Sequence, residues 1–142
     1  MNINFKDLSI SVLLSITIGI LYWLYIDSYP YTTSAITAVG TVISIILSMM
    51  SIKLLWVMND YKQIRNSELI ATLVKFKIID KVISHLFIIY ISSLTLIVVC
   101  MLNSNGVYDN NILTVMLIAF NILFFQKTFK ATLSILTKVQ RS

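Results

Sequence analysis

The 142-residue sequence predicts an all-α membrane protein with four transmembrane helices. Apolar residue types make up 58% of the chain and charged types only 12%, and the mean hydropathy of +0.88 exceeds that of water-soluble domains. The charged residues are clustered, which leaves four apolar segments long enough to cross a bilayer. None of these segments alternates apolar and polar residues as a membrane β-strand does, so we expect helices.

Polar and charged segments separate the four expected spans, which belong to one domain covering residues 1–142. The spans run over residues 8–26, 31–58, 82–102 and 112–125. An amphipathic segment, 59–81, joins the second span to the third, and an amphipathic tail, 126–142, follows the fourth.

The distribution of basic residues predicts the orientation of the spans. All eleven Lys and Arg residues lie at the N-terminus, around the connection between the second and third spans, or at the C-terminus. The other two connections contain Asp27 and Asp109 and no basic residue. Since cytoplasmic loops carry the excess of Lys and Arg, we expect both termini on the cytoplasmic side of a bacterial inner membrane. The basic charge balance thus indicates topology and contact with anionic lipid rather than nucleic-acid binding.

Small hydroxyl side chains form a stripe along the second span. On an ideal helix at about 100° per residue they fall within an arc of roughly 100°, and apolar residues cover the opposite side. Two interpretations stay open: close helix packing helped by hydroxyl hydrogen bonds, or the lining of a water-filled pathway. The candidate packing or pore-lining residues of this span are Thr37, Gly40, Thr41, Ser44, Ser48 and Ser51.

The first span has its own row of small residues, in which Ser11, Ser15 and Gly19 recur every four positions. This spacing lets a second helix backbone approach closely, so we expect the row to pack against another helix. The connection to the second span is only about four residues long and contains Pro30, which suits the first turn of a helix. We therefore expect the first and second spans to form an antiparallel hairpin.

Thr114, Asn121 and Thr128 recur at seven-residue intervals along the fourth span, and Asn121 falls near its middle. A carboxamide in hydrocarbon requires a hydrogen-bonding partner, so this row should face another helix or its own copy in a homo-oligomer. The apolar run itself, of about fourteen residues, is short for a span. It must gain length from the polar loop before it or from Lys127 and Lys130, whose side chains can reach the interface.

The segment 59–81 is the largest part that we expect outside the membrane. A helix is expected from Ser67 onward, and it either lies on the membrane, packs on the inner ends of the bundle, or receives a cytosolic partner protein. The candidate partner-docking residues are Lys62, Arg65, Lys75 and Lys77.

The sequence contains no motif for a cofactor, a metal ion or catalysis. No span carries Asp, Glu, Lys or Arg near its middle, which weighs against proton-coupled transport. His85 and Cys100, the only histidine and the only cysteine, cannot build a metal site. Glycine-rich phosphate loops and paired carboxylates in a plausible pocket are also missing, so we expect no enzymatic activity.

The second span contains Gly40 and Thr41 followed by Ile43 and Ile45, and leads through an apolar run to a basic segment and the third span. This layout, over nearly the whole chain, resembles two families of small four-span bacterial phage-exclusion proteins: RexB, and KwaA, the membrane subunit of the Kiwa system. The resemblance implies a homo-oligomer, for example a tetramer. A KwaA-like protein would sense phage attachment or membrane perturbation and dock a cytosolic DNA-binding effector. A RexB-like protein would instead be a holin-like ion channel that depolarises the membrane.

Overall fold

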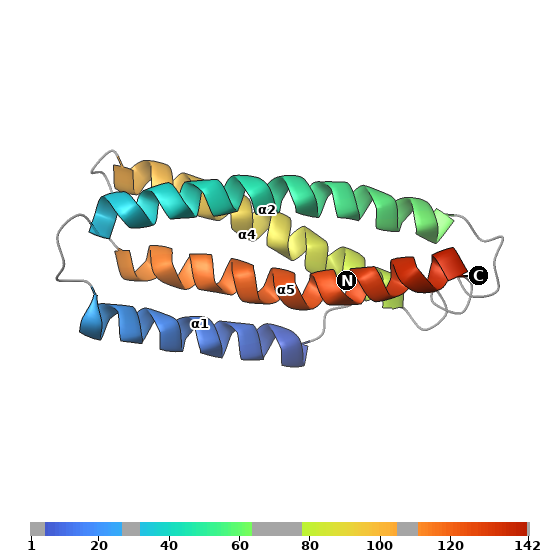
Figure 1. The fold of residues 1–142 in the computed structure, drawn as a ribbon, viewed down its shortest axis with the longest axis horizontal. Coiled ribbons are helices and arrows are strands. Elements are labelled where there is room, and N and C mark those ends of the chain that lie inside the picture. The colour runs from blue at the N-terminus through green and yellow to red at the C-terminus, as the bar shows by residue number, and fades with distance from the viewer. Residues whose placement is uncertain (1–4, 27–31, 64–77, 105–110, 142) are drawn as a thin grey trace.

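The computed structural model describes residues 5–26, 32–63, 78–104 and 111–141, which form four α-helices (Figure 1). Their bounds are Phe5–Tyr25 for α1, Thr32–Gln63 for α2, Ile78–Ser104 for α4 and Asn111–Arg141 for α5. Each helix is long and apolar enough to cross a membrane. This confirms the predicted class, an all-helical multi-pass membrane protein.

The sequence explains why these helices are uninterrupted. The only proline, Pro30, precedes α2, so no helix loses a backbone hydrogen bond to a proline ring. Two of the three glycines, Gly19 and Gly40, lie inside helices at positions that a neighbouring helix approaches closely. A continuous helix also satisfies every backbone N–H and C=O group away from its ends, which a hydrocarbon environment requires.

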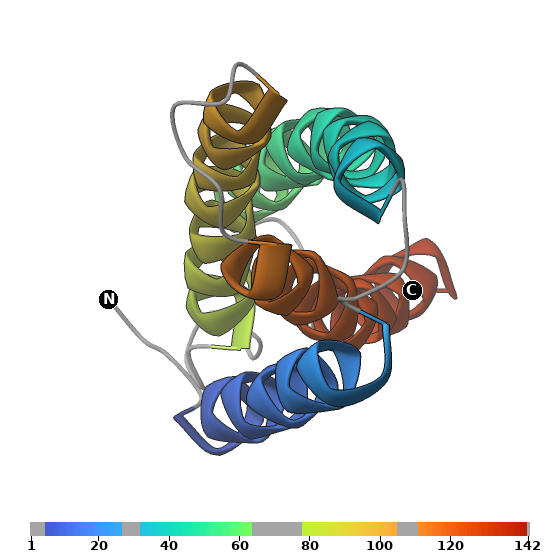
Figure 2. The same ribbon diagram turned by 90° about the vertical axis from the view of Figure 1, so that its left-hand side faces the viewer.

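Helix α5 is the central element of the bundle. It contacts α1, α2 and α4, while α2 packs along α4 in the most extensive helix pair. Figure 2 shows α5 between α1 on one side and the pair of α2 and α4 on the other. The chain direction alternates from helix to helix, so α1 begins, and α2 and α5 end, toward the same end of the bundle (Figure 1).

The expected hairpin of the first two spans is wrong in one respect. The two helices run antiparallel, but in the described part of the chain α1 packs extensively only against α5. The physical reason is that a short connection fixes only the ends of two helices, whereas side-chain fit decides which helices pack along their length. The small-residue face of α1 finds that fit on α5.

The charged side chains that the structure describes all lie toward one end of the bundle, which we call the charged end. They are Lys6, Asp7, Lys53, Asp60, Asp80, Lys81, Lys127 and Lys130, and each lies in the half of its helix nearer that end. The opposite end, where α2 begins and α4 ends, has no charged side chain among the described residues. We call it the network end, after the hydrogen bonds found there.

The spacing between these two ends matches the thickness of a bilayer. At about 1.5 Å per helical residue, Lys53 lies roughly 32 Å from the start of α2. Lys127 and Lys130 lie roughly 24 and 29 Å from the start of α5, and the long side chain of Lys127 can reach the interface from there. Lys81 lies roughly 35 Å from the end of α4. The hydrocarbon core of a bilayer is about 30 Å thick. The uncharged part of the bundle therefore fits the membrane interior.

Three helices continue beyond the lysines and pack around a core of their own, which we call the charged-end core. It consists of Met58 from α2, Ile79, Val82 and Leu86 from α4, and Ile135 from α5. Three of these five side chains are farther from the network end than the lysine that comes first on their helix. Met58 lies beyond Lys53 of α2, Ile79 beyond Lys81 of α4, and Ile135 beyond Lys127 of α5. The charged-end core thus joins α2, α4 and α5 where they leave the membrane.

Two helices extend past their expected spans. Helix α2 continues past position 58 to Gln63, and α5 continues past position 125 to Arg141 without a break. In α5 the reason is that Thr128, Thr132 and Ile135 are buried and continue the interior face of the helix. The fourth span therefore gains its length at its charged end. The helix expected from Ser67 lies outside the described residues.

Candidate functional site

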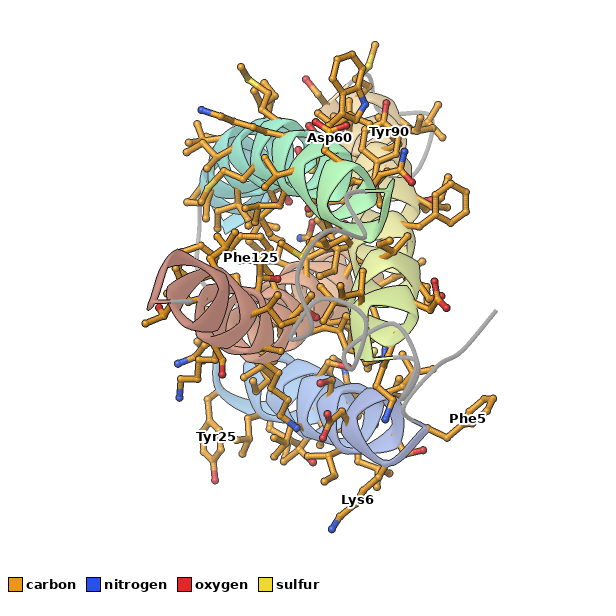
Figure 3. All side chains as sticks on the ribbon, turned by 90° about the vertical axis from the view of Figure 1, so that its right-hand side faces the viewer. Phe5, Lys6, Tyr25, Asp60, Tyr90 and Phe125 are labelled. Atoms are coloured by element: carbon orange, nitrogen blue, oxygen red, sulfur yellow. The ribbon has the colours of Figure 1, made fainter. Side chains whose placement is uncertain are left out.

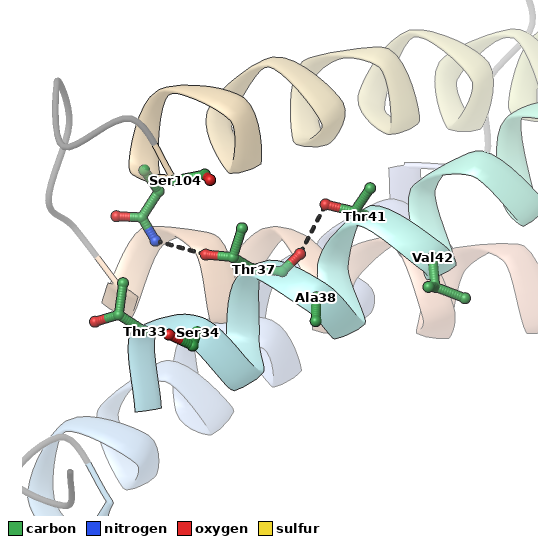
Figure 4. A pocket seen from close by; sticks show the side chains of 8 residues that line it. Thr33, Ser34, Thr37, Ala38, Thr41, Val42 and Ser104 are labelled. Atoms are coloured by element: carbon green, nitrogen blue, oxygen red, sulfur yellow. Dashed lines mark hydrogen bonds between the residues drawn. The ribbon is translucent and has the colours of Figure 1, made fainter. Parts of the chain in front are cut away.

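Four polar side chains from three helices form a hydrogen-bond network at the network end. Asn103 of α4 donates through Nδ2 to Thr37 Oγ1 of α2 (3.3 Å) and to Asn111 Oδ1 of α5 (3.1 Å). Asn111 donates through its own Nδ2 to Thr33 Oγ1 of α2 (2.9 Å). Figure 4 shows Thr33 and Thr37 on α2, with the bond to Thr37 dashed. The network therefore connects α2, α4 and α5 at one depth.

Asn103 and Asn111 are site residues that sequence reasoning did not find. Both flank the polar loop between the third and fourth spans, where Asn usually indicates a turn. The sequence nevertheless contained a pattern that could have identified Asn103 and Asn111. In four antiparallel spans, the end of the third and the start of the second and fourth meet at one membrane surface. Carboxamides placed there can both donate to and accept from the hydroxyls of Thr33 and Thr37.

An open pocket of about 530 Å³ lies beside the network, between α2 and α4. Asn103 lines it and is only 5% exposed, and its Oδ1 has no hydrogen-bond partner among the described residues. The lining residues that the structure describes are uncharged; they are Thr33, Ser34, Thr37, Ala38, Thr41, Val42, Asn103 and Ser104 (Figure 4). The described lining of the pocket thus presents several hydroxyl groups, whereas Asn103 Oδ1 has almost no accessible surface and does not face the open space.

The hydroxyl stripe of α2 is turned into the bundle for most of its length. Gly40, Ser44 and Ser51 are buried, and Thr37, Thr41 and Ser48 are partly buried. Three of the hydroxyls donate to carbonyl oxygens of their own helix: Thr41 to Thr37 (2.7 Å), Ser44 to Thr41 (2.9 Å) and Ser48 to Ile45 (2.9 Å). A hydroxyl has only one hydrogen to donate, so these three need no acceptor on another helix. Small volume is therefore the main property of the stripe, which favours the packing interpretation.

Gly40 lies where three helices approach one another. A Cβ built at this position would stand 2.7 Å from Cys100 Sγ of α4 and 3.1 Å from Ile118 Cδ1 of α5. Carbon atoms in ordinary contact are about 3.5–4.0 Å apart, so a larger residue fits only if a neighbour moves. Cys100 itself is buried and free of any disulfide.

The row of small residues on α1 packs against α5. Ser11, Ser15 and Gly19, together with Tyr22, are the buried residues of this helix. A Cβ built at Gly19 would stand 2.4 Å from Cγ of Met116 in α5, so the two helices are in close contact there. Most other side chains of α1 are exposed and would face lipid; Figure 3 shows Phe5 and Tyr25 pointing away from the bundle.

Asn121 and its neighbours at seven-residue spacing are buried within the single chain. Thr114 and Asn121 have no exposed surface, and Thr128 is 2% exposed. Asn121 Nδ2 donates to a carbonyl oxygen of its own helix (2.8 Å), and Oδ1 accepts from Ser93 Oγ of α4 at 3.3 Å. The Ser93 hydroxyl lies closer to the carbonyl oxygen of Ile89 (2.7 Å). The row thus faces helices of the same bundle, and Asn121 needs no second copy of the chain to satisfy its amide.

His85 belongs to an aromatic contact between α4 and α5. It is 6% exposed, and its ring centroid lies 5.0 Å from that of Phe124, which is fully buried. Phe120 stacks on Phe124 at 5.5 Å. Within the four described ranges, no three His, Cys, Asp or Glu side chains lie close enough together to hold a metal ion.

The expected partner-docking residues cannot be placed in this site. Arg65, Lys75 and Lys77 lie outside the described residues, as does the side chain of Lys62. Comparisons of the chain with protein-family models, with curated proteins and with solved structures gave no match.

Proposed function

We propose that this protein is a non-enzymatic subunit of a bacterial inner-membrane system, and that its charged end docks a cytosolic partner protein. The observation that carries the proposal is the charged-end core. A chain that only had to cross the membrane could end its helices at the boundary, whereas α2 and α5 run on for about ten residues, or roughly 15 Å. Met58, Ile79 and Ile135 hold these extensions together with α4. The extensions therefore offer a supported surface outside the membrane.

The charges at this end support a cytoplasmic location for both termini. An excess of Lys and Arg marks the cytoplasmic side of membrane proteins, and Lys53, Lys81, Lys127 and Lys130 of three helices lie in the halves of those helices nearer the charged end. The candidate docking residues belong to the segment 59–81, which in the sequence connects the charged end of α2 to the charged end of α4. A partner with an acidic surface would be attracted and oriented by the four candidate docking residues, whereas the side chains of Lys127 and Lys130 reach toward the membrane interface.

The setting that we propose is defence against phage, in a homo-oligomer whose network end senses attachment or membrane perturbation. The support for this setting is the resemblance of the chain layout to the RexB and KwaA families. Helices α2 and α5 run without a break from the network end to the charged-end core. A displacement at Thr33 or Asn111 would therefore reach the docking surface along a continuous helix.

Capture from native membranes tests the docking proposal. The tagged protein is purified in mild detergent before and during phage infection, beside a variant in which four residues become Ser: Lys62, Arg65, Lys75 and Lys77. A control variant carries Lys127→Ser and Lys130→Ser. We expect the wild type and the control to retain one cytosolic protein that the fourfold variant loses, and we expect phage to plate more efficiently on cells with the fourfold variant. Recovery of no cytosolic protein, or equal recovery by all three, would end the proposal.

An ion pore is the second candidate function, and the pocket is the observation in its favour, because the hydroxyls of Thr37 and Thr41 line it. Ser44 and Ser51, further along the same stripe, have no exposed surface within the single chain, which argues for packing instead. Ion flux into liposomes that contain the purified protein decides between the two. A pore requires flux by the wild type that Ser48→Leu reduces, and liposomes without flux exclude it.

A further inference from the structure

We propose that His85 is a proton-binding site near the charged end of the bundle, and that Asp7 on α1 controls how tightly the proton is held. Protonation of the imidazole and packing of α1 are then coupled. This inference goes beyond the proposed function, because it concerns residues within the bundle and requires no partner protein. Three features carry it: a buried imidazole, an acidic side chain on the inward face of α1, and a helix register that brings the two to nearly the same level.

The first feature is the environment of His85, the only histidine of the chain. Its side chain is 6% exposed, and its ring centroid lies 5.0 Å from that of Phe124, which is fully buried. Histidine is the side chain whose charge ordinarily changes between about pH 5 and 8. A positive charge at a buried site is costly unless a group of opposite charge compensates it. A proton on His85 therefore needs an acidic group close by.

The second feature is the position of Asp7 on the face of α1 that packs into the bundle. The buried residues Ser11, Ser15 and Gly19 recur every four positions, and Asp7 precedes Ser11 by the same interval. Residues four apart lie on one face of a helix. Asp7 is accordingly half-buried, whereas Lys6 beside it is exposed. Helix α1 therefore turns an acidic side chain toward the other helices.

The third feature is the level of the two residues along the bundle. Gly19 of α1 lies against Met116 of α5. Counted from this contact toward the charged end, Asp7 lies roughly 18 Å along α1, and Phe124 lies roughly 12 Å along α5. Asp7 is therefore about one helical turn from the level of the ring that contacts His85. Its carboxylate is close enough to act on the imidazole through its charge.

Two charged groups of the described helices act on the imidazole, in opposite directions. The carboxylate of Asp7 attracts the protonated ring, and the ammonium group of Lys81, one turn away on α4, repels it. Helix α5 contributes the ring of Phe124 to this contact. The other charged side chains described at this end are Lys6 of α1, Lys53 and Asp60 of α2, Asp80 of α4, and Lys127 and Lys130 of α5. The tightness of proton binding therefore depends on how close α1 holds Asp7.

The dependence also works in the other direction. If the charge of Asp7 strengthens proton binding at His85, a proton on His85 strengthens the attraction of Asp7 by the same factor. In the described part of the chain, α1 packs extensively only against α5. Protonation of His85 would therefore attach the start of α1 to a second helix, α4.

Proton binding can be measured directly, because the chain has a single histidine. The full-length protein is purified through a tag without histidine and labelled with ¹⁵N-histidine, so that its ring-nitrogen NMR signals come from His85 alone. We expect these signals to titrate reversibly between about pH 5 and 8. Asp7→Asn should weaken proton binding several-fold and Lys81→Gln should strengthen it. The matched control Lys53→Gln, at an exposed lysine of α2, should leave it unchanged.

A second measurement tests the coupling to α1. The free energy of unfolding is measured by detergent titration at about pH 7.5 and about pH 5.5, on either side of the ordinary histidine titration. Asp7→Asn should cost more stability at the lower pH, because only there does Asp7 attract a charged imidazole. This dependence on pH should vanish when Asp7→Asn is combined with His85→Gln. The NMR titration does not need the His85→Gln variant, so it stands even where that variant fails to fold.

Three outcomes would overturn the inference. Ring signals that stay constant between about pH 5 and 8 would show that His85 binds no proton in this range. Equal titration midpoints in the wild type and Asp7→Asn would remove Asp7 from the site. An equal cost of Asp7→Asn at both pH values would show that protonation does not strengthen the packing of α1. None of these measurements involves a cytosolic protein, so they are independent of the docking proposal.

Discussion

Replacing Gly19 by Leu should separate α1 from the rest of the bundle. A Cβ at this position would stand 2.4 Å from Cγ and 2.5 Å from Cε of Met116. Since carbon atoms in contact are normally about 3.5–4.0 Å apart, even Ala would require these atoms to move by roughly 1 Å. Methionine has three rotatable bonds and can make room for one methyl group. A Leu side chain adds three further carbons to the same space.

We expect Gly19→Ala to lower the free energy of unfolding by at most about 1 kcal/mol, and Gly19→Leu by about 2–3 kcal/mol, the upper part of the usual range for overpacking. The loss in Gly19→Leu should come mainly from weaker packing of α1 on the bundle, because in the described part of the chain α1 packs extensively only against α5. Titration with sodium dodecyl sulfate in mixed micelles, followed by circular dichroism, measures the free energy of unfolding for each variant.

Two further variants show whether the contact with Met116 is responsible. Thr17→Leu adds similar bulk on the exposed face of α1, where the hydroxyl donates only to its own helix, and should change the free energy of unfolding by less than about 0.5 kcal/mol. Met116→Ala, introduced together with Gly19→Leu, removes the side chain that the Leu would overlap. The double variant should therefore recover at least part of the free energy of unfolding that Gly19→Leu loses. If Gly19→Leu unfolds like Thr17→Leu, or if Met116→Ala only adds to its loss, the reasoning about this contact is refuted.

Three further substitutions in the interior of the bundle, and one exposed control, are tested by the same detergent titration. Gly40→Val should lower the free energy of unfolding by about 1–3 kcal/mol and make Cys100 more reactive toward thiol reagents, because its Cβ would stand 2.7 Å from Cys100 Sγ; unchanged labelling would contradict the close contact. Asn121→Leu should change the free energy of unfolding by less than about 1 kcal/mol, since the amide is bonded chiefly within its own helix, and a loss above about 3 kcal/mol would indicate a further partner. Phe124→Ala, at a fully buried ring, should cost about 3–5 kcal/mol, whereas Phe5→Ala, at 71% exposure, should cost less than about 0.5 kcal/mol; equal losses would contradict the burial of Phe124.

Hydropathy predicted the four helices correctly, because a membrane interior forces each apolar segment to satisfy its own backbone as a helix. It predicted the end of the fourth span less well. The apolar run stops where Lys127 appears, but the buried face continues through Thr128, Thr132 and Ile135 to the charged end. A count of apolar residues averages over all sides of a helix, whereas packing depends on one side only. The length of α5 was therefore visible only in the spacing of its interior residues.

The choice of helix partners could not be predicted in the same way. The row of Ser11, Ser15 and Gly19 indicates that some helix approaches α1 closely, but nothing in the spacing says which one. Connection length suggested α2, and the fit around Met116 favours α5. The network at Asn103 was missed for a related reason, since its four members come from three helices and no local pattern contains them all.

The internal hydrogen bonding of α2 has a consequence for its freedom of movement. Because Thr41, Ser44 and Ser48 donate to their own helix, a small axial slide of α2 along α4 would break none of these bonds and would disturb mainly van der Waals contact. Thr33 and Thr37, by contrast, link α2 to α5 and α4. The register of this 32-residue helix is therefore held by a few hydrogen bonds near its first turns, by the close contact at Gly40 and by Met58 in the charged-end core, and not by the bonding of its own stripe.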